Sequence, residues 1–451
     1  MIINFARITE IFQFVGAKMI TPRTLSGFKD RLPKEAYAKS QMIKSLINSF
    51  EKFGFAPIET PHLEYAEILK KQGSDEIQKE MYHFLDHGNR EVALRFDLTV
   101  PLARFISQYK NELGLPFKRY CIGNVFRGER AQKGRYREFT QCDFDFIGTN
   151  GIGSDSEIVQ LIYQALSDLG IKHFTISLNN RKIFNGLCES LGAQDSVVEI
   201  LRIVDKIDKI GKEEVTKELQ DFTPLDNKKI ETLLNFIAIK QEGSTKDFFS
   251  KIQSYKALNT TLNEGICELE NLCDLLENLV PQEFYKINLS IARGLGYYTG
   301  IIYETTLDDL ASLGSVCSGG RYDNLTQNFS KEQMSGVGAS IGLDRLLAGL
   351  EELGLIKESN PANLLVIALN SLKYGYEVGS VLREEGLKVE VYPEITKPKK
   401  SFQYANNRGY TWVVIVGDEE EKTKTCSLKN MELGTQENML LLSEIKDKIL
   451  S

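Results

Sequence analysis

The spacing of hydrophobic and polar positions divides the chain into regions of different periodicity. Between residues 21 and 179, short runs of strand character alternate with helical runs at residues 41–53 and 157–169. The strands that this pattern predicts cover residues 91–95, 118–122, 137–146 and 173–178. This alternation is typical of a mixed α/β unit built around a sheet.

The middle of the chain is dominated by helical spacing. From residue 182 to residue 283, apolar residues recur three and four positions apart. Strand character returns at residues 287–292 and 301–305, and residues 336–350 predict a strand that runs into a helix. We interpret this order as a helical insertion between two halves of one α/β unit.

A separate small unit is predicted at the end of the chain. A polar segment at residues 357–363, which contains Pro361, has the composition of a linker. The pattern after it is of the βαβ type, with a helix at residues 374–385 and strands at residues 364–369, 389–392 and 412–416. About 90 residues suffice for an independent small domain.

Composition excludes several classes of protein. The chain has 451 residues, a net charge of -7 and seven cysteines without a CxxC pair, which favours a reducing cytoplasm over a disulfide framework. No apolar run has the length needed to span a bilayer, and residues 1–20 lack the features of a signal peptide. We expect these residues to be an extension, either an amphipathic helix or the product of a start codon upstream of Met19.

The segment at residues 119–148 is the richest in chemistry. Two predicted strands flank a polar loop with several cations, and guanidinium groups match phosphate oxygens bidentately. The alternative is a solvated basic hairpin in an antiparallel sheet. The cations are Arg127, Arg130, Lys133, Arg135 and Arg137.

The strand after this loop carries polar residues on one face. Alternation puts Phe139, Gln141, Asp143 and Asp145 on the same side of the sheet. Polar side chains that face inward cost free energy unless a partner satisfies them. Gln141 and Asp145 are therefore candidates for binding a polar ligand.

These strings resemble the motifs of class II aminoacyl-tRNA synthetases, in the version of the histidyl-tRNA synthetase family. Residues 119–148 resemble motif 2, and the other motifs follow the family's order along the chain. Together they are far more specific than any of them alone. They are motif 1 at residues 53–61, the amino-acid loop at 94–101, the histidine motifs at 293–300 and 318–325, and motif 3 at 336–345.

The resemblance implies an α+β fold, with an antiparallel class II sheet flanked by helices, a helical insertion and a C-terminal α/β anticodon-binding domain. It implies a cytoplasmic homodimer that activates L-histidine with ATP and Mg²⁺, then transfers the histidyl group to tRNA(His). The expected divisions are an extension at 1–20, catalytic parts at 21–181 and 286–356, an insertion at 182–285, a linker at 357–363 and an anticodon domain at 364–451.

The resemblance also assigns roles to residues. Arg127 would hold the α-phosphate, Arg345 the γ-phosphate, and Arg293 would lie beside both the carboxylate and the α-phosphate. Asp97, Thr99 and Gln141 would bind the ammonium group, and Asp145 and Tyr298 would read the imidazole nitrogens. The remaining candidates are Tyr297 and Tyr322 for the histidine pocket, Arg130 and Gln132 for the tRNA acceptor end, and Lys397, Lys399, Lys400 and Arg408 for the anticodon.

Two positions depart from the family pattern. Gly296 stands where many members have Asp, and Asp145 stands where many bacterial members have Glu. The resemblance assigns no metal ligand, and His83 and His87 lack the further ligands that a zinc site needs.

The competing interpretation is a non-catalytic regulatory paralogue of ATP phosphoribosyltransferase. Such paralogues generally lack the C-terminal domain and parts of motifs 2 and 3. Arg127, Arg345 and a long tail after Pro361 are all present here, which favours the enzyme.

Overall fold

The largest element of the fold is a mostly antiparallel sheet. The computed structural model describes residues 20–71, 75–130, 134–291, 298–324, 326–330, 332–356 and 362–450. The sheet has the strand order β1-β5-β6-β11-β10-β9-β7-β8, with parallel pairing only at its two edges, β1 with β5 and β7 with β8, within these ranges. Its strands are β1 (Ala56–Pro57), β5 (Phe117–Phe126), β6 (Glu138–Ile147), β7 (Phe174–Asn180), β8 (Tyr285–Ile287), β9 (Ile301–Leu307), β10 (Ser315–Tyr322) and β11 (Gly336–Gly342).

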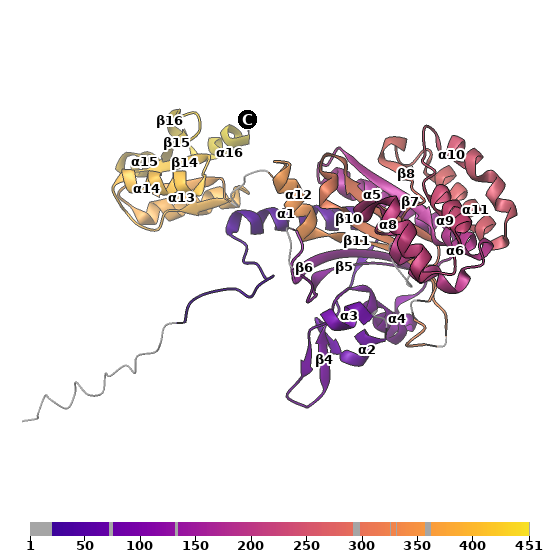
Figure 1. The fold of residues 1–451 in the computed structure, drawn as a ribbon. Coiled ribbons are helices and arrows are strands. Elements are labelled where there is room, and N and C mark those ends of the chain that lie inside the picture. Colours follow the sequence, from indigo (N-terminus) through magenta and orange to yellow (C-terminus); the bar gives the residue numbers. More distant parts are fainter. Residues whose placement is uncertain are drawn as a thin grey trace, which may run out of the picture.

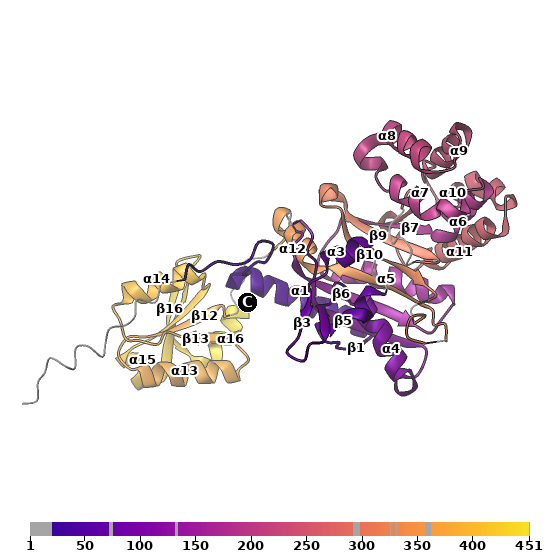
Figure 2. The ribbon, with the colours of Figure 1, turned by 60° about the horizontal axis from the view of Figure 1, so that its bottom comes forward.

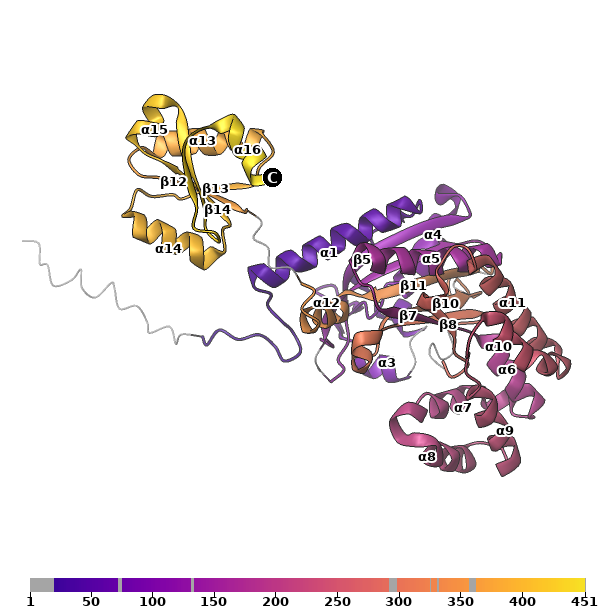
Figure 3. The same cartoon turned by 90° about the horizontal axis from the view of Figure 1, so that it is seen from above.

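Helices cover one face of this sheet (Figures 1 and 3). Phe50 of α1 (Pro33–Lys52) packs on Phe144 of β6 with ring centroids 5.0 Å apart. The helix α5 (Ile152–Asp168) and the helix α12 (Leu343–Glu352) add buried side chains to the same core. Because strand side chains alternate, Cys142 and Phe144 face this core and their neighbours face the opposite side.

A second layer lies against the other side, near β5. The small sheet β2-β4-β3 and three helices form it, and Figure 1 shows them below β5 and β6. This layer carries the connection from β4 to α4, where Asp97 lies. The elements are β2 (Leu63–Tyr65), α2 (Ala66–Lys70), α3 (Asp75–Glu80), β3 (His83–Leu85), β4 (Glu91–Leu94) and α4 (Thr99–Leu113).

The predicted helical insertion is helical in the structure. Figure 1 shows it at the end of the sheet that carries β7 and β8, where its first helix directly follows β7. The elements are α6 (Arg181–Ser190), η2 (Gln194–Ser196), α7 (Val197–Val204), α8 (Ile207–Phe222), α9 (Asn227–Ile237), α10 (Thr245–Ile252), η3 (Gln253–Ala257), α11 (Thr260–Leu276) and η4 (Gln282–Phe284). A further 3-10 helix, η5 (Asp308–Leu313), joins β9 to β10.

One predicted strand is wrong over most of its length. Residues 287–292 were expected to be extended, but β8 ends at Ile287. The side-chain amide of Asn179 donates to the carbonyls of Leu289 and Ile291, at 3.2 and 3.3 Å. These buried carbonyls therefore have a side-chain partner and need no neighbouring strand.

The C-terminal unit is a second, mixed sheet with helices on both faces (Figures 2 and 3). Its order is β13-β12-β14-β15-β16, and β12 pairs in parallel with β13 and β14. Alternate residues of β12 enter different cores, Leu364 on one side and Leu365 on the other, so the whole strand is buried. The elements are β12 (Leu364–Ala368), α13 (Leu372–Glu384), β13 (Val389–Val391), α14 (Pro398–Arg408), β14 (Trp412–Val416), α15 (Asp418–Thr423), β15 (Thr425–Asn430), β16 (Gln436–Leu441) and α16 (Leu442–Leu450).

The α+β fold class is confirmed, and so are the other predicted strands and helices, with ends shifted by up to eight residues, the largest shift being the start of α1 at Pro33. Within the described ranges, no helix is both long enough and apolar enough to cross a bilayer.

Candidate functional site

The site lies on the face of the sheet opposite α1 and α5. Across the strands, Asp145 of β6 is paired with Arg119 of β5 on one side and with Gly338 of β11 on the other. A Cβ atom on Gly338 would lie 2.5 Å from Cγ of Asp145 and 2.6 Å from the carbonyl oxygen of Phe144. Only glycine leaves room at this position for the carboxylate above it.

The carboxylate of Asp145 has two partners. Tyr322 on β10 donates its hydroxyl hydrogen to Oδ1 at 2.5 Å, and Nη2 of Arg119 lies 2.5 Å from Oδ2. Burial raises the pKa of Asp145, whereas the charge of Arg119 and the hydrogen bond from Tyr322 lower it. The pair is buried on both sides, so its geometry is fixed by protein rather than by water.

Asp143 lies two residues before Asp145 on the same face. Burial raises its pKa to about 7, and the charge of Asp145 adds to this, whereas Arg119 and a hydrogen bond from Ser340 lower it. Its Oδ1 atom is buried and has no hydrogen-bond partner among the described residues. An acceptor in that position is open to a donor from a ligand.

Gln141 continues the polar row on β6. Its Nε2 donates to the hydroxyl oxygen of Ser340 at 2.9 Å, which fixes the orientation of the amide. The carbonyl oxygen Oε1 is buried and, within the described part of the chain, has no hydrogen-bond partner. The amide therefore presents an acceptor to the site.

Asp97 reaches the site from the start of α4. Its Oδ1 accepts the backbone N–H of Val100 at 3.0 Å, so the carboxylate is held against the first turn, where Thr99 begins the helix. Burial raises the pKa of Asp97 to about 6, against the opposing effects of this hydrogen bond and of the charges on Arg127 and Arg119.

Tyr298 lies over Gly320 of β10. A Cβ atom on Gly320 would come within 2.9 Å of Cδ1 of Tyr298 and 2.7 Å of the carbonyl oxygen of Ile301. Burial raises the pKa of Tyr298, and the charges of Asp145, Asp143 and Asp97 raise it further. Its phenol is therefore neutral and can donate or accept a hydrogen bond.

A cavity of about 250 Å³ adjoins Gln141 and Ser340. Two arginines line it: Arg127 directly follows β5, and Arg345 lies in α12. The Nε of Arg127 donates to the carbonyl of Phe96 at 2.9 Å and its guanidinium lies over Phe139 at 5.1 Å. Nη1 of Arg345 donates to the carbonyl of Ser315 at 2.7 Å. Both guanidinium groups are thus oriented by protein contacts.

Asp344, the residue before Arg345, connects α12 to the sheet through polar contacts. Asp344 is buried and accepts the backbone N–H of Thr140 at 2.6 Å. It also pairs with Arg31, and with Lys39 at 3.1 Å. The start of α12, and with it Arg345, is therefore tied both to β6 and to the segment around α1.

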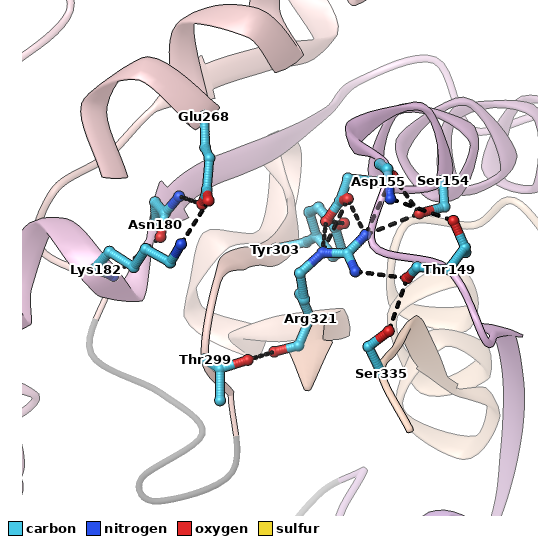
Figure 4. A network of polar contacts seen from close by, with 11 residues as sticks. Thr149, Ser154, Asp155, Asn180, Lys182, Glu268, Thr299, Tyr303, Arg321 and Ser335 are labelled. Atoms are coloured by element: carbon cyan, nitrogen blue, oxygen red, sulfur yellow. Dashed lines mark hydrogen bonds and ion pairs between the residues drawn. The ribbon is translucent and has the colours of Figure 1, made fainter. Parts of the chain in front are cut away.

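Behind the site, Arg321 is the centre of a polar network (Figure 4). It forms a buried ion pair with Asp155 of α5, whose Oδ1 also accepts the hydroxyl hydrogen of Tyr303 at 3.1 Å. Nη1 of Arg321 donates to the carbonyl of Thr149 at 2.9 Å, and its own carbonyl accepts the N–H of Thr299 at 2.8 Å. The network fixes the backbone at Thr299, directly after Tyr298, and at Arg321, directly before Tyr322.

Comparison with protein families decides the relationship of the chain. A family model described as histidyl-tRNA synthetase matches residues 27–346. The chain belongs to the histidyl-tRNA synthetase family. A model described as an anticodon binding domain matches residues 363–451.

Individual relatives of this family member cover almost all of it. A histidine–tRNA ligase of Wolinella succinogenes is 60% identical over 96% of this chain and 99% of its own. One of Helicobacter hepaticus is 59% identical over 93% of this chain and 96% of its own. The crystal structure of a Nostoc histidyl-tRNA synthetase has a TM-score of 0.87 at 35% identity and covers 95% of this chain and 100% of its own.

One structural neighbour shares the fold alone. It is described as an ATP phosphoribosyltransferase regulatory subunit/histidyl-tRNA synthetase from Bacillus halodurans and is 22% identical, with a TM-score of 0.72. It covers 89% of this chain and 99% of its own.

The structure brings many of the proposed site residues together. Asp97, Gln141, Asp145, Tyr298 and Tyr322 surround the polar face of the sheet, and Thr99 starts the helix beside it. Arg127 and Arg345 line the adjoining cavity. Arg293, Gly296, Tyr297 and Gln132 lie outside the described residues.

The other candidates lie on the surface. Arg130 is exposed at the end of the stretch after β5. Lys397, Lys399 and Lys400 are exposed at the start of α14, and Lys400 lies 3.5 Å from Glu394. Arg408 lies at the other end of this helix, about 12 Å away along its axis, so it is not part of the lysine cluster.

The sequence pattern did not single out Arg119, Ser340 or Gly338. Arg119 is a charged residue in a predicted strand, which indicates a buried ion pair. The sequence does not show which carboxylate is its partner, because the pairing with Asp145 depends on the register of β5 with β6. Asp143 was recognised as facing the same side as Asp145 without receiving a role. Among the described residues, no group of three or more His, Cys, Asp or Glu side chains could hold a metal ion.

Proposed function

We propose that this protein is a histidine–tRNA ligase. It forms histidyl-adenylate from L-histidine and ATP with release of diphosphate, then transfers the histidyl group to the 3′ end of tRNA(His) with release of AMP. The observation that supports this most directly is that a buried acidic pocket around Asp145 adjoins a cavity lined by Arg127 and Arg345.

The acidic pocket suits a cationic amino acid with a ring that carries hydrogen-bonding nitrogens. Asp97, Gln141 and Thr99 offer oxygen acceptors to the α-ammonium group. Asp145 accepts one imidazole N–H, and the neutral phenol of Tyr298 serves the other nitrogen. Tyr322 holds Asp145. The family resemblance adds Tyr297, which lies outside the described residues, to the histidine pocket. An apolar amino acid would leave these buried groups unpaired, which gives strong discrimination.

The arginine-lined cavity suits the triphosphate. The carboxylate of histidine attacks the α-phosphorus while two anions approach each other, so fixed cations lower the barrier. Arg127 holds the α-phosphate and Arg345 the γ-phosphate, and the family resemblance assigns Arg293, which lies outside the described residues, to the reacting groups. A single preorganised donor of this kind contributes roughly 10²–10³ in rate.

The residues around the cavity fit a phosphate-bound Mg²⁺. This ion takes most of its ligands from phosphates and water, with one or two carboxylates from protein. Asp344 is engaged by cations and a backbone N–H, whereas Glu129 also lines the cavity and its carboxylate lies 3.8 Å from Arg135. Glu129 would hold the ion, which supplies positive charge to the departing diphosphate.

The C-terminal unit binds the anticodon of tRNA(His). The lysines at 397, 399 and 400 meet at the start of α14, where the helix dipole adds to their positive charge. Arg130 is our candidate for contact with the acceptor end, and the family resemblance adds Gln132, which lies outside the described residues. The functional divisions are residues 21–181 and 286–356 for catalysis, 182–285 for the insertion and 364–451 for the anticodon.

The active form is a cytoplasmic homodimer. Apolar side chains are exposed on the small sheet, with Leu63, Tyr65 and Phe84 between 41 and 49% exposed and Leu85 64% exposed. Apolar groups gathered on one surface favour contact with another protein surface. Motif 1 precedes this sheet, which supports a second copy of the chain as the partner.

Histidine-dependent exchange between ATP and radioactive diphosphate tests the first step, and charging of tRNA(His) tests the second. The full-length protein should perform both with histidine and neither with leucine. A non-catalytic regulatory paralogue would show no exchange with any amino acid, and that result would overturn the proposal.

A further inference from the structure

Arg119 is the most deeply buried charged group at the site. Its exposed fraction is 0%, and those of its neighbours Asp143 and Asp145 are 3 and 4%. It lies directly opposite Asp145 in the register of β5 with β6, and the two are ion-paired at 2.5 Å. A buried guanidinium needs partners that offset its desolvation, and the partner of Arg119 is a carboxylate.

This arrangement contains one guanidinium for two neighbouring carboxylates. Asp145 uses both oxygens, one toward Arg119 and one toward Tyr322. Asp143 receives no such ion pair in the described residues, and its Oδ1 is buried without a hydrogen-bond partner. Two like charges this close oppose each other's ionisation, and a cation beside them favours it.

We propose that Arg119 is a specificity-determining positioning residue for the amino acid: it keeps the carboxylate of Asp145 ionised and fixed, and leaves the open oxygen of Asp143 for the ligand. The inference rests on the proposed histidine-activating function. Without Arg119, the two aspartates would share a proton at neutral pH. A protonated Asp145 would present a donor where the imidazole N–H needs an acceptor.

Other titratable groups face the two aspartates from every side of the pocket. Burial raises the pKa of the Cys121 thiol on β5, and the pKa of Tyr298 is raised as well, so both are neutral at pH 7. Burial also raises the pKa of the Cys317 thiol on β10, where Tyr322 is the donor to Asp145. Beyond these lie Asp97, Arg95 and Arg127. None of them forms an ion pair with Asp145 in the described part of the chain, so Arg119 is the group whose removal changes its ionisation most.

The test is Arg119→Met, measured by diphosphate exchange between pH 6.5 and 9. The matched control is Lys118→Met, which removes a cation from the adjacent position on the same strand but from the opposite face, where Lys118 pairs with Glu157. The ratio of the variant's histidine KM to that of the unmodified protein is the readout, because titration of histidine itself cancels in the ratio.

We expect Arg119→Met to raise the histidine KM about tenfold or more at pH 7, with the ATP KM unchanged. Removing the cation raises the pKa of both aspartates, so the ratio of KM values should fall as the pH rises, by up to about tenfold per unit. Lys118→Met should show a ratio near one at every pH. A pH-independent ratio for Arg119→Met, or a change confined to kcat, would overturn the proposal.

Two further variants keep the test decisive. Adding Asp143→Asn to Arg119→Met removes the competing carboxylate, so the pH dependence of the KM ratio should weaken even if the histidine KM stays high. An unchanged pH dependence contradicts the proposal.

If Arg119→Met does not fold, Arg119→Lys retains the charge with poorer geometry and should raise the histidine KM equally at all pH values. An unaltered KM in that variant overturns the proposal. Absence of histidine-dependent exchange in the unmodified protein would instead refute the proposed function.

Discussion

The close approach of Gly338 to Asp145 makes a sharp prediction for Gly338→Ala. The new methyl group would lie 2.5 Å from Cγ of Asp145 and 2.6 Å from the carbonyl oxygen of Phe144, whereas real Cβ atoms keep at least 3.0 Å. The nearest atom, Oδ1 of Asp145, lies 2.1 Å from this Cβ position, so the carboxylate must retreat by about 0.9 Å to reach even that limit. The backbone oxygen cannot move independently of β6, so relief of its contact shifts β6 relative to β11, and the side chain of Asp145 is displaced as well.

The displacement has a cost for stability and for binding. Overpacking of a buried site costs roughly 1–3 kcal/mol, and here the 2.5 Å contacts of Asp145 with Tyr322 and Arg119 would lengthen as well. A displacement of about 1 Å at a reacting or binding group can cost about 10²-fold in rate. We expect the histidine KM to rise about ten- to a hundredfold while the ATP KM changes less than about threefold.

Diphosphate exchange at varied histidine and ATP measures both constants, and thermal denaturation measures stability. The control is Gly153→Ala near the start of α5, where a Cβ atom would meet nothing within 4 Å. That variant should be neutral or slightly more stable, by up to about 1 kcal/mol. An unchanged histidine KM in folded Gly338→Ala would refute the placement of the imidazole at Asp145.

Three further predictions concern the arginines of the cavity, the C-terminal unit and Asp143. Arg345→Ala and Arg293→Ala should each slow histidine activation at least about a hundredfold in a folded protein, because each removes a fixed cation from the phosphates; normal exchange rates would refute those roles. A chain that ends near Lys357 should keep some exchange activity but charge tRNA poorly, provided that it still dimerises, and undiminished charging would exclude a tRNA-binding tail. Because burial raises the pKa of Asp143 to about 7, its ionisation destabilises the folded state as the pH rises from about 4 to about 8. Asp143→Asn should therefore gain melting temperature relative to the unmodified protein over that range, and a constant difference would contradict the assignment.

The sequence predicted the parts of the site that depend on local periodicity. Alternation along residues 137–146 correctly put Gln141, Asp143 and Asp145 on one face, because strand side chains point to opposite sides in turn. It could not pair Arg119 with Asp145, since cross-strand partners depend on register, and one residue of slip would reverse the faces. The approach of Asp97 to Arg119 and Arg127 depends on how α4 packs on the sheet, which no local pattern encodes.

Two of the elements that the sequence analysis missed, α14 and β16, have weak apolar patterns. The helix α14 buries Ser401 and Ala405 rather than a stripe of large apolar residues, so its helical period is hidden in a polar segment. In β16 most positions are exposed, and no alternation marks the strand. The opposite error arose after β8, where buried Leu289 and Ile291 imitate strand alternation although Asn179 satisfies their carbonyls.

The glycines of the sheet make room for the polar side chains of the site. Gly338 and Gly320 remove side chains from the middle of the sheet, and the space is occupied by the carboxylate of Asp145 and the ring of Tyr298. Larger apolar residues there would stabilise the fold at the expense of the pocket. Arg119 is ion-paired with Asp145 but not with Asp143. An oxygen of Asp143 and the side-chain carbonyl oxygen of Gln141 are therefore without a hydrogen-bond partner among the described residues. A ligand that brings its own donors completes this set, so the same groups that weaken the unliganded pocket select a cationic, ring-bearing amino acid over an apolar one.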